Sequence, residues 1–109
     1  HLTLFEALQS DGLAVGMIVQ STAGHDYSRL GVIIALRPPF ALIVDGQYRL
    51  ITKPKKKRLS HLRPVADTEP GLLAAALQLP EEGQQNSAIR SLISRTIAPY
   101  LIKKEPEAD

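Results

Sequence analysis

The chain contains no cysteine and no tryptophan among its 109 residues. The lack of cysteine excludes disulfide bonds, cysteine-ligated zinc and thiol catalysis. Aromatic residues make up only 5% of the sequence, so the core must be built from Leu, Ile, Val and Ala. No apolar run approaches the roughly 18 residues that a membrane-spanning helix needs, and no signal peptide is recognisable. We therefore expect one small domain of a cytoplasmic protein that does not enter a membrane.

The sequence also lacks the side-chain patterns of common catalytic and cofactor sites. Neither His25 nor His61 has a carboxylate at ligand spacing, which argues against a metal site. Ser21, His25 and Asp26 do not suit a catalytic triad, because adjacent residues on a strand point to opposite faces. There is no glycine-rich phosphate loop of the nucleotide-binding kinds. We expect a non-catalytic protein without a metal or another cofactor.

Positive charge is concentrated in one part of the chain. Residues 15–65 hold nine Lys or Arg and two acidic residues, a net charge of +7, whereas the whole chain carries only +2. The run KPKKKR, residues 53–58, supplies five of these positive charges. A basic half joined to an acidic half is typical of a protein that contacts a polyanion. The alternative is that the charge serves solubility alone.

The same residues have the turn signals of a small β-domain. Runs rich in Val and Ile predict strands in GMIVQS (16–21) and RLGVIIAL (29–36), and Pro38-Pro39 then interrupts the chain. Asp45-Gly46 is a preferred pair for a type I′ turn, so we expect residues 40–44 and 47–52 to form an antiparallel hairpin. RLSHLRPV (58–65) supplies a last strand. Five short strands in so few residues suit a small, strongly bent barrel.

After Val65 the spacing of apolar residues becomes helical. EPGLLAAALQLP (69–80) predicts a short helix. A second, amphipathic helix is predicted to begin at Asn86 or Ser87 and to end or kink at Pro99. Its apolar stripe comprises Ile89, Leu92, Ile93, Ile97, Tyr100 and Leu101. The stripe would cover the open side of the barrel or bind a partner chain. The expected organisation is an N-terminal tail (1–12), a barrel (13–66), a helical extension (67–102) and a disordered acidic tail (103–109).

Two stretches resemble a known family. GMIVQSTAGHDYSRLGVII (16–34) resembles the KOW motif of ribosomal large-subunit proteins and NusG-type transcription factors, with Gly24 in its turn and Gly31 before its second strand. LIVDGQYRLITKPKKKRLSHLRPV (42–65) resembles small bacterial KOW-domain RNA-binding proteins. In those proteins a DG hairpin, an arginine three residues on, a PK-rich loop and a His-Leu pair recur together. The resemblance covers residues 15–65 and implies an SH3-like barrel with RNA, above all ribosomal RNA, as its ligand. The family turn carries a basic residue where this chain has His25, which moves the expected contact to the later loop.

We therefore expect a mainly β protein: a small SH3-like five-stranded barrel with a C-terminal α-helical extension. It would be a ribosome-associated module that binds ribosomal or other structured RNA through the loop of residues 53–58. Pro54 stiffens this loop, and lysines act as point charges along a phosphate backbone. The expected RNA-binding residues are His25, Arg29, Arg49, Lys53, Lys55, Lys56, Lys57, Arg58 and His61. Gly24 and Gly31 are expected to serve the backbone geometry of the motif.

Several alternatives stay open at this stage. The basic run could be a solvated loop or a nuclear import signal, and His61 could pack at the barrel edge instead of touching RNA. A different class of function is a protein-interaction module that uses the barrel surface or the C-terminal amphipathic helix.

Overall fold

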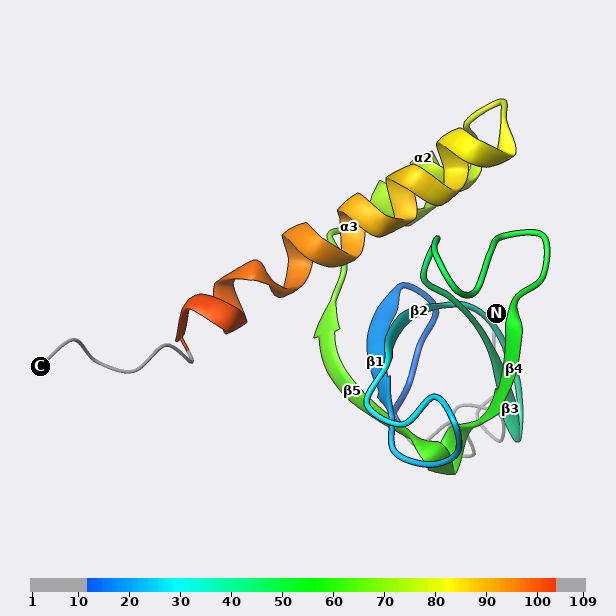
Figure 1. Ribbon diagram of the computed structural model, residues 1–109, viewed down its shortest axis with the longest axis vertical. Helices are drawn as coiled ribbons and strands as arrows, with labels where there is room; N and C mark the ends of the chain where they lie inside the picture. The colour runs from blue at the N-terminus through cyan, green and yellow to red at the C-terminus, as the bar shows by residue number, and fades with distance from the viewer. Residues whose placement is uncertain (1–11, 104–109) are drawn as a thin grey trace, which may run out of the picture.

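The computed structural model describes residues 12–103, which form a curved sheet with two helices against it (Figure 1). The strands are β1 (Met17–Ser21), β2 (Leu30–Arg37), β3 (Phe40–Val44), β4 (Lys55–Arg58) and β5 (Leu62–Asp67). A 3-10 helix, η1 (Leu59–His61), joins β4 to β5, and the helices α2 (Leu72–Leu77) and α3 (Glu82–Lys103) follow. The expected N-terminal tail (1–12) and acidic tail (103–109) lie outside the described residues, except for one residue of each.

The sheet has the strand order β4-β3-β2-β1-β5, and every neighbouring pair is antiparallel. This confirms the expected five-stranded antiparallel sheet with a helical extension. The expected closure into a barrel is wrong for residues 12–103, because β4 and β5 each pair with one neighbour only. The turn at η1 leads the chain from one edge of the sheet to the other, and Leu59 donates its N–H to Pro39 O at 2.9 Å there.

Strands β2 and β3 bury side chains on both of their faces, which explains their unbroken apolar runs. Neighbours on a strand point to opposite faces, so Ile18 and Val19 belong to different cores. The helix-side core comprises Ile18, Val32, Val44, Leu73, Ala76, Ile89, Leu92 and Ile93. The inner core, inside the curve of the sheet, comprises Leu13, Val19, Ile33, Ala41, Ile43 and Leu59. Irregular pairing in β1 and β2 is consistent with the strong curvature, since bulges bend strands.

The apolar stripe of α3 packs on the protein's own sheet. Of the two predicted alternatives, the sheet and a partner chain, the structure has the first. Ile89 is fully buried between the sheet and α2, and Leu92 and Ile93 are buried beside it. The predicted helix start is wrong, because α3 begins at Glu82. Asn86 instead lies inside the helix, where its buried Oδ1 accepts the Ile51 N–H at 2.9 Å. Pro99 also lies within α3 and does not end it.

The predicted Asp45-Gly46 hairpin is wrong, because β3 pairs with β4 and residues 45–54 form a loop. One Asp45 carboxylate oxygen accepts the backbone N–H groups of Gln47, Tyr48 and Arg49, each at 2.8 Å. Together with Asn86 Oδ1, this oxygen satisfies donors that a hairpin would have paired with β3. The side chain of Asp45 thus takes the backbone hydrogen bonds that the predicted hairpin would have formed between residues 47–49 and β3.

We expect Gly46→Ala to lower the free energy of unfolding by about 1–3 kcal/mol, the range for a strained backbone position. Gly46 has a φ of +79°, and a Cβ there would collide with Asn86 O and lie 3.0 Å from Arg90 Cγ. Chemical denaturation of the two proteins measures the difference. Gly83→Ala is the matched control, because a Cβ at Gly83 meets nothing within 4 Å and alanine favours the helix. Equal losses in both variants would show that contact with α3 does not constrain the loop.

Candidate nucleic-acid interface

The basic run is a strand and not the predicted loop. Residues 55–58 form β4, which pairs with β3 and leaves its other edge free within the described sheet. Side chains alternate along a strand, so Lys55 and Lys57 line a pocket on the inner side, whereas Lys56 and Arg58 are exposed on the outer side. Lys53, in the loop before β4, is exposed as well. The run therefore presents its charge on two different faces.

The outward cations of β4 are organised around one aromatic ring. Lys56 Nζ lies 4.6 Å and Arg58 Cζ 5.2 Å from the centre of the Phe40 ring on the neighbouring strand. These distances fit cation–π contacts, which hold both side chains near the surface of β3. A second role is compatible with this arrangement, because lysines on an edge strand also discourage pairing with other chains.

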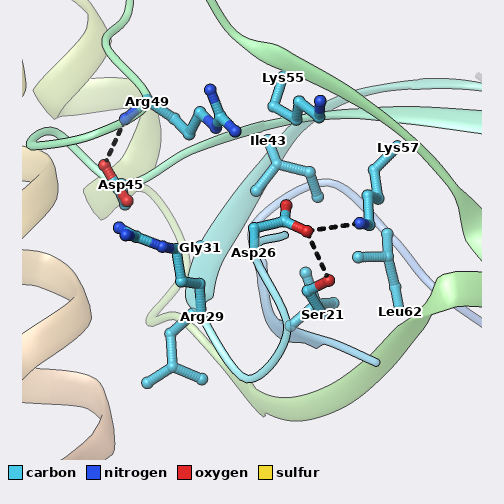
Figure 2. A pocket seen from close by; sticks show the side chains of 12 residues that line it. Ser21, Asp26, Arg29, Gly31, Ile43, Asp45, Arg49, Lys55, Lys57 and Leu62 are labelled. Carbon is cyan, nitrogen blue, oxygen red and sulfur yellow. Dashed lines mark hydrogen bonds and ion pairs between the residues drawn. The ribbon is translucent and has the colours of Figure 1, made fainter. Parts of the chain in front are cut away.

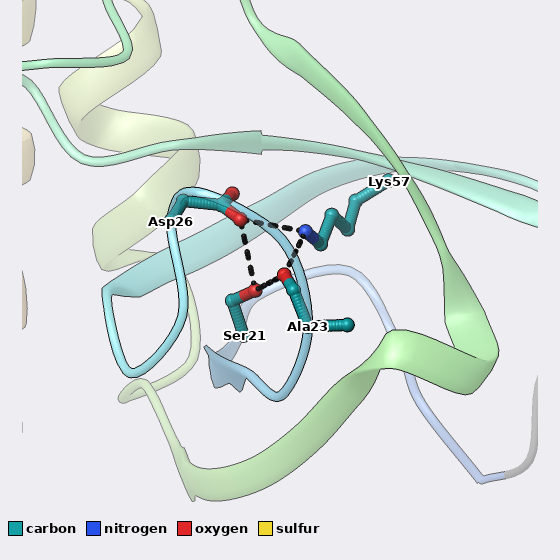
Figure 3. A network of polar contacts seen from close by, with 4 residues as sticks. All are labelled: Ser21, Ala23, Asp26 and Lys57. Carbon is teal, nitrogen blue, oxygen red and sulfur yellow. Dashed lines mark hydrogen bonds and ion pairs between the residues drawn. The ribbon is translucent and has the colours of Figure 1, made fainter.

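Lys57, one of the predicted RNA-binding residues, is buried in a polar network (Figure 3). Its Nζ donates to Asp26 Oδ1 at 2.6 Å and to Ala23 O at 2.7 Å. Ser21 Oγ lies 3.1 Å from the same Asp26 oxygen and 2.9 Å from Ala23 O. The side chains of Lys57 and Asp26 are only 10% and 14% exposed. Lys57 therefore fastens the loop of residues 22–29 to β4 and already shares its charge with Asp26.

The network controls the ionisation of Asp26. Burial favours the neutral carboxyl, but the hydrogen bonds from Lys57 and Ser21 and the charge of Lys57 outweigh it. The pKa of Asp26 is consequently lowered from its ordinary value of 3.8. The ionised form of Asp26 is thus the form that the fold stabilises.

Acid should remove the contribution of Asp26 to stability. Because its pKa is lower in the folded state than in the unfolded state, the stabilisation is fully present above the unfolded pKa. It is lost as the pH falls through the folded pKa. We expect the difference in unfolding free energy between wild type and Asp26→Asn to be largest near neutral pH and to shrink below about pH 4. Denaturation series from neutral to acidic pH measure it. Asp67→Asn, at an exposed carboxylate of β5, is the control. A constant difference at all pH values would contradict the ion pair.

Gly24 and Gly31 lie at positions that disfavour a side chain, Gly24 by its backbone conformation and Gly31 by its close neighbours. Gly24 has a φ of +87°. A Cβ on Gly31 would collide with the Ile43 side chain and approach Val44 O to 3.2 Å. His25 and His61 are both exposed, His25 in the loop of residues 22–29 and His61 at the end of η1. His61 is thus not packed into the edge of the sheet, and its backbone O accepts the Thr22 N–H at 2.9 Å.

Arg29 and Arg49 meet at a pocket where two loops approach the start of β4 (Figure 2). Its apolar floor is formed by Val19, Leu30, Gly31, Ile43 and Leu62, and its polar lining by Ser21, Asp26, Arg29, Asp45, Arg49, Lys55 and Lys57. Figure 2 shows Arg49, Lys55 and Lys57 arranged around one side of Asp26. Arg29 Cζ lies 3.9 Å from the centre of the Tyr48 ring, so a cation–π contact fixes this guanidinium at the rim.

The structure therefore divides the predicted site residues into separate groups. Arg29, Arg49 and Lys55 line one pocket, Lys56 and Arg58 lie on the outer face, and Lys57 is part of the fold. The support of Arg29 by Tyr48 was not predicted, because the sequence pattern placed this ring in a strand. Arg90 of α3 was not predicted either; it donates to Gly46 O and lines a second pocket with Arg29 and Tyr48. No local pattern marks a contact between residues so far apart in the chain.

Comparisons with known proteins add no family assignment: no protein-family model matches the chain, and no curated protein matches its sequence. Among residues 12–103, no three His, Cys, Asp or Glu side chains are grouped as metal ligands would be. The helices of this part of the chain include none with the length and apolar character needed to cross a membrane.

Proposed function

We propose that the protein is a non-catalytic RNA-binding module that holds structured RNA, such as ribosomal RNA, by its phosphate backbone. The observation that carries the proposal is the state of its cations. Residues 15–65 contain nine Lys and Arg, and the salt bridge of Lys57 with Asp26 engages one of them. Within the described residues the other eight have no ion-pair partner. Unpaired cations gathered on one domain are the electrostatic footprint of a nucleic-acid-binding protein.

The resemblance to KOW-domain proteins supports the same proposal. The curved five-stranded sheet has the strand number expected of an SH3-like barrel, although its edge strands are not paired. The basic residues that carry the resemblance are not scattered. They lie on β4 and on the two loops beside it, where some line one pocket and others are exposed on the outer face of β4.

The proposed interface differs from the predicted one by the loss of Lys57. It consists of the outer cations, which we define as Lys53, Lys56 and Arg58, and of the pocket cations, which we define as Arg29, Arg49 and Lys55. His25 and His61 are both exposed, and they lie close in the sequence to Arg29 and Arg58, respectively. We include both in the proposed surface. Lysine contacts of this kind bind a backbone without demanding one base sequence, which suits RNA recognised by shape.

The rival function, a protein-interaction module built on the C-terminal helix, loses its main support. Ile89, Leu92 and Ile93 are buried in the helix-side core, so this part of the stripe is not a free surface. We therefore argue for RNA alone.

The test is titration of a structured RNA with the full chain at several salt concentrations. If about five phosphates are engaged, log affinity should fall against log salt with a slope of about −3.5. Raising salt from about 50 to 200 mM should then cost about two decades in affinity. The variant Lys53→Gln/Lys56→Gln/Arg58→Gln should flatten the slope by about two units, because it removes three exposed charges. Glutamine keeps part of each apolar stem over the surface, so the fold should persist.

The control variant is Arg95→Gln, at an exposed arginine of α3 that shares a pocket with Asp67 and Glu69. Its slope should equal that of the wild type. No binding of structured RNA by the wild type at low salt would refute the proposed function. Binding with an unchanged slope in the triple variant would remove the outer cations from the interface.

A further inference from the structure

The pocket beside β4 has an excess of positive charge in a confined place. Four cations and two carboxylates line it, a net charge of +2. One pair, Lys57 with Asp26, is internally neutralised. The remaining carboxylate, Asp45, directs one oxygen to three backbone N–H groups. Among the described residues no ion pair engages Arg29, Arg49 or Lys55, so the pocket keeps an excess of two positive charges.

Arg49 shows the clearest sign that the pocket is built for an anion. Its Nε is buried and has no hydrogen-bond partner among residues 12–103. Buried donors without a partner are rare in folded proteins, because they give up hydration and gain nothing in return. The guanidinium presents its N–H groups as a planar fork that matches two oxygens of one phosphate. An anion held by the terminal N–H groups of this fork would bring a negative charge beside the orphaned donor.

The backbone at Arg49 and Lys55 and the guanidinium of Arg29 are held in place before any ligand arrives. The Arg49 N–H donates to Asp45 Oδ1 at 2.8 Å, and Arg49 O accepts the Asp45 and Gly46 N–H groups at 2.9 and 3.1 Å. The Arg29 guanidinium rests on the Tyr48 ring. The backbone of Lys55 is held by the pairing of β4 with β3, where it lies opposite Ile43. Less conformational freedom is lost on binding when the backbone and one guanidinium are already placed, which favours a defined site over diffuse attraction.

We propose that this pocket, which we name the Arg49 pocket, binds one phosphate group of the RNA backbone, with the Arg49 fork as its main donor. The inference rests on the proposed function, and it adds one specific phosphate-binding site to a surface that attracts RNA by its charge. An RNA strand is the favoured source of the phosphate, because the outer cations Lys53 and Lys56 flank Lys55 in the chain and offer exposed positive charge to further phosphates of the same strand. The apolar floor excludes water beneath the phosphate and strengthens its contacts with the cations.

The first arm of the test uses inorganic phosphate and the full-length protein. The Arg Nε–H resonances are followed by NMR while phosphate replaces chloride at constant ionic strength. The Arg49 resonance should shift and saturate, whereas that of Arg95, whose pocket contains Asp67 and Glu69, should not. Equal, non-saturating shifts of both resonances would overturn the pocket as a phosphate site.

The second arm uses RNA and the variant Arg49→Lys, which keeps the charge and removes the fork. Its affinity for structured RNA should fall about tenfold, the equivalent of one charge-assisted hydrogen bond. The salt slope should stay within about half a unit of that of the wild type, since the number of charges is unchanged. Arg95→Lys, the matched control, should bind as the wild type does, and thermal unfolding confirms that both variants are folded.

The outcomes separate the two proposals. Wild-type affinity in Arg49→Lys would overturn the inference and leave the proposed function intact. A saturable phosphate shift at Arg49 without RNA binding by the wild type would refute the proposed function. The pocket would then be a site for small phosphate compounds instead of an RNA backbone.

Discussion

Replacing Lys57 by methionine should destabilise the protein by about 3 kcal/mol, the lower end of the range for breaking a buried ion pair. Methionine keeps the length and the apolar stem of the side chain, so the loss comes from the charge and its hydrogen bonds. Asp26 would remain largely buried with a charge that is stabilised only by hydrogen bonds from Ser21 and the backbone among the described residues. In a domain of this size, the midpoint of thermal unfolding should fall by roughly 10–20 °C.

The matched control is Lys56→Met, one residue earlier on the same strand. Lys56 is exposed, so its loss should change the stability by less than about 0.5 kcal/mol. A double-mutant cycle with Asp26→Asn isolates the interaction of the pair. When the two side chains interact, the summed losses of stability in the two single variants should exceed the loss in the double variant. Similar melting temperatures for the two methionine variants would show that β4 is not oriented as described.

Ile89→Ala should cost about 2–5 kcal/mol, the range for deleting large aliphatic side chains from a core. Ile89 is fully buried in the helix-side core, where α2, α3 and the sheet meet. The substitution leaves a cavity that the rigid sheet cannot fill. Urea denaturation monitored by circular dichroism gives the loss directly.

A weaker effect is expected at the other end of the stripe. Ile97 only borders the helix-side core and is partly exposed, so Ile97→Ala should lose clearly less than Ile89→Ala. If Ile97→Ala were the more damaging change, α3 would have to be shifted along the sheet by two turns. Loss of stability in neither variant would reopen the stripe as a surface for a partner.

Local patterns predicted most of the secondary structure because the relevant interactions are local. Runs of Val and Ile marked β1, β2 and β3, and Pro38-Pro39 separated β2 from β3. The spacing of Ile89, Leu92 and Ile93 predicted both the helix and its packing against the sheet.

The candidate site was located by charge but misread in its structure. Lysine has a low strand propensity, and the sequence between Asp45 and Lys55 offered an apparently better partner for β3. The outcome depends on one carboxylate oxygen of Asp45 and on Asn86, which lies more than thirty residues away in the chain. The pairing of Lys57 with Asp26 is equally remote. Such contacts follow from the assembled fold and leave no periodic trace in the sequence.

The edge position of β4 also affects how the basic charge is explained. Lysines on a free edge protect the sheet against pairing with other chains, whatever their role in RNA binding. This role concerns the outward side chains of Lys56 and Arg58. It does not account for Arg29 and Arg49, which lie outside the strands and still carry unpaired charge into the pocket.

The uniform composition of β4 has a consequence for how its alignment is decided. Residues 55–58 are all cationic, so sliding the strand by one position would still bring a positive side chain to Asp26. The residues of the strand therefore do not determine its register, and the register must be set by the residue that follows the strand. Leu59 sets it, because its side chain is buried in the inner core and its N–H is bonded to Pro39 O. A lysine inserted within the run would accordingly be pushed out toward residues 45–54, while the cation that precedes Leu59 by two positions would still face Asp26.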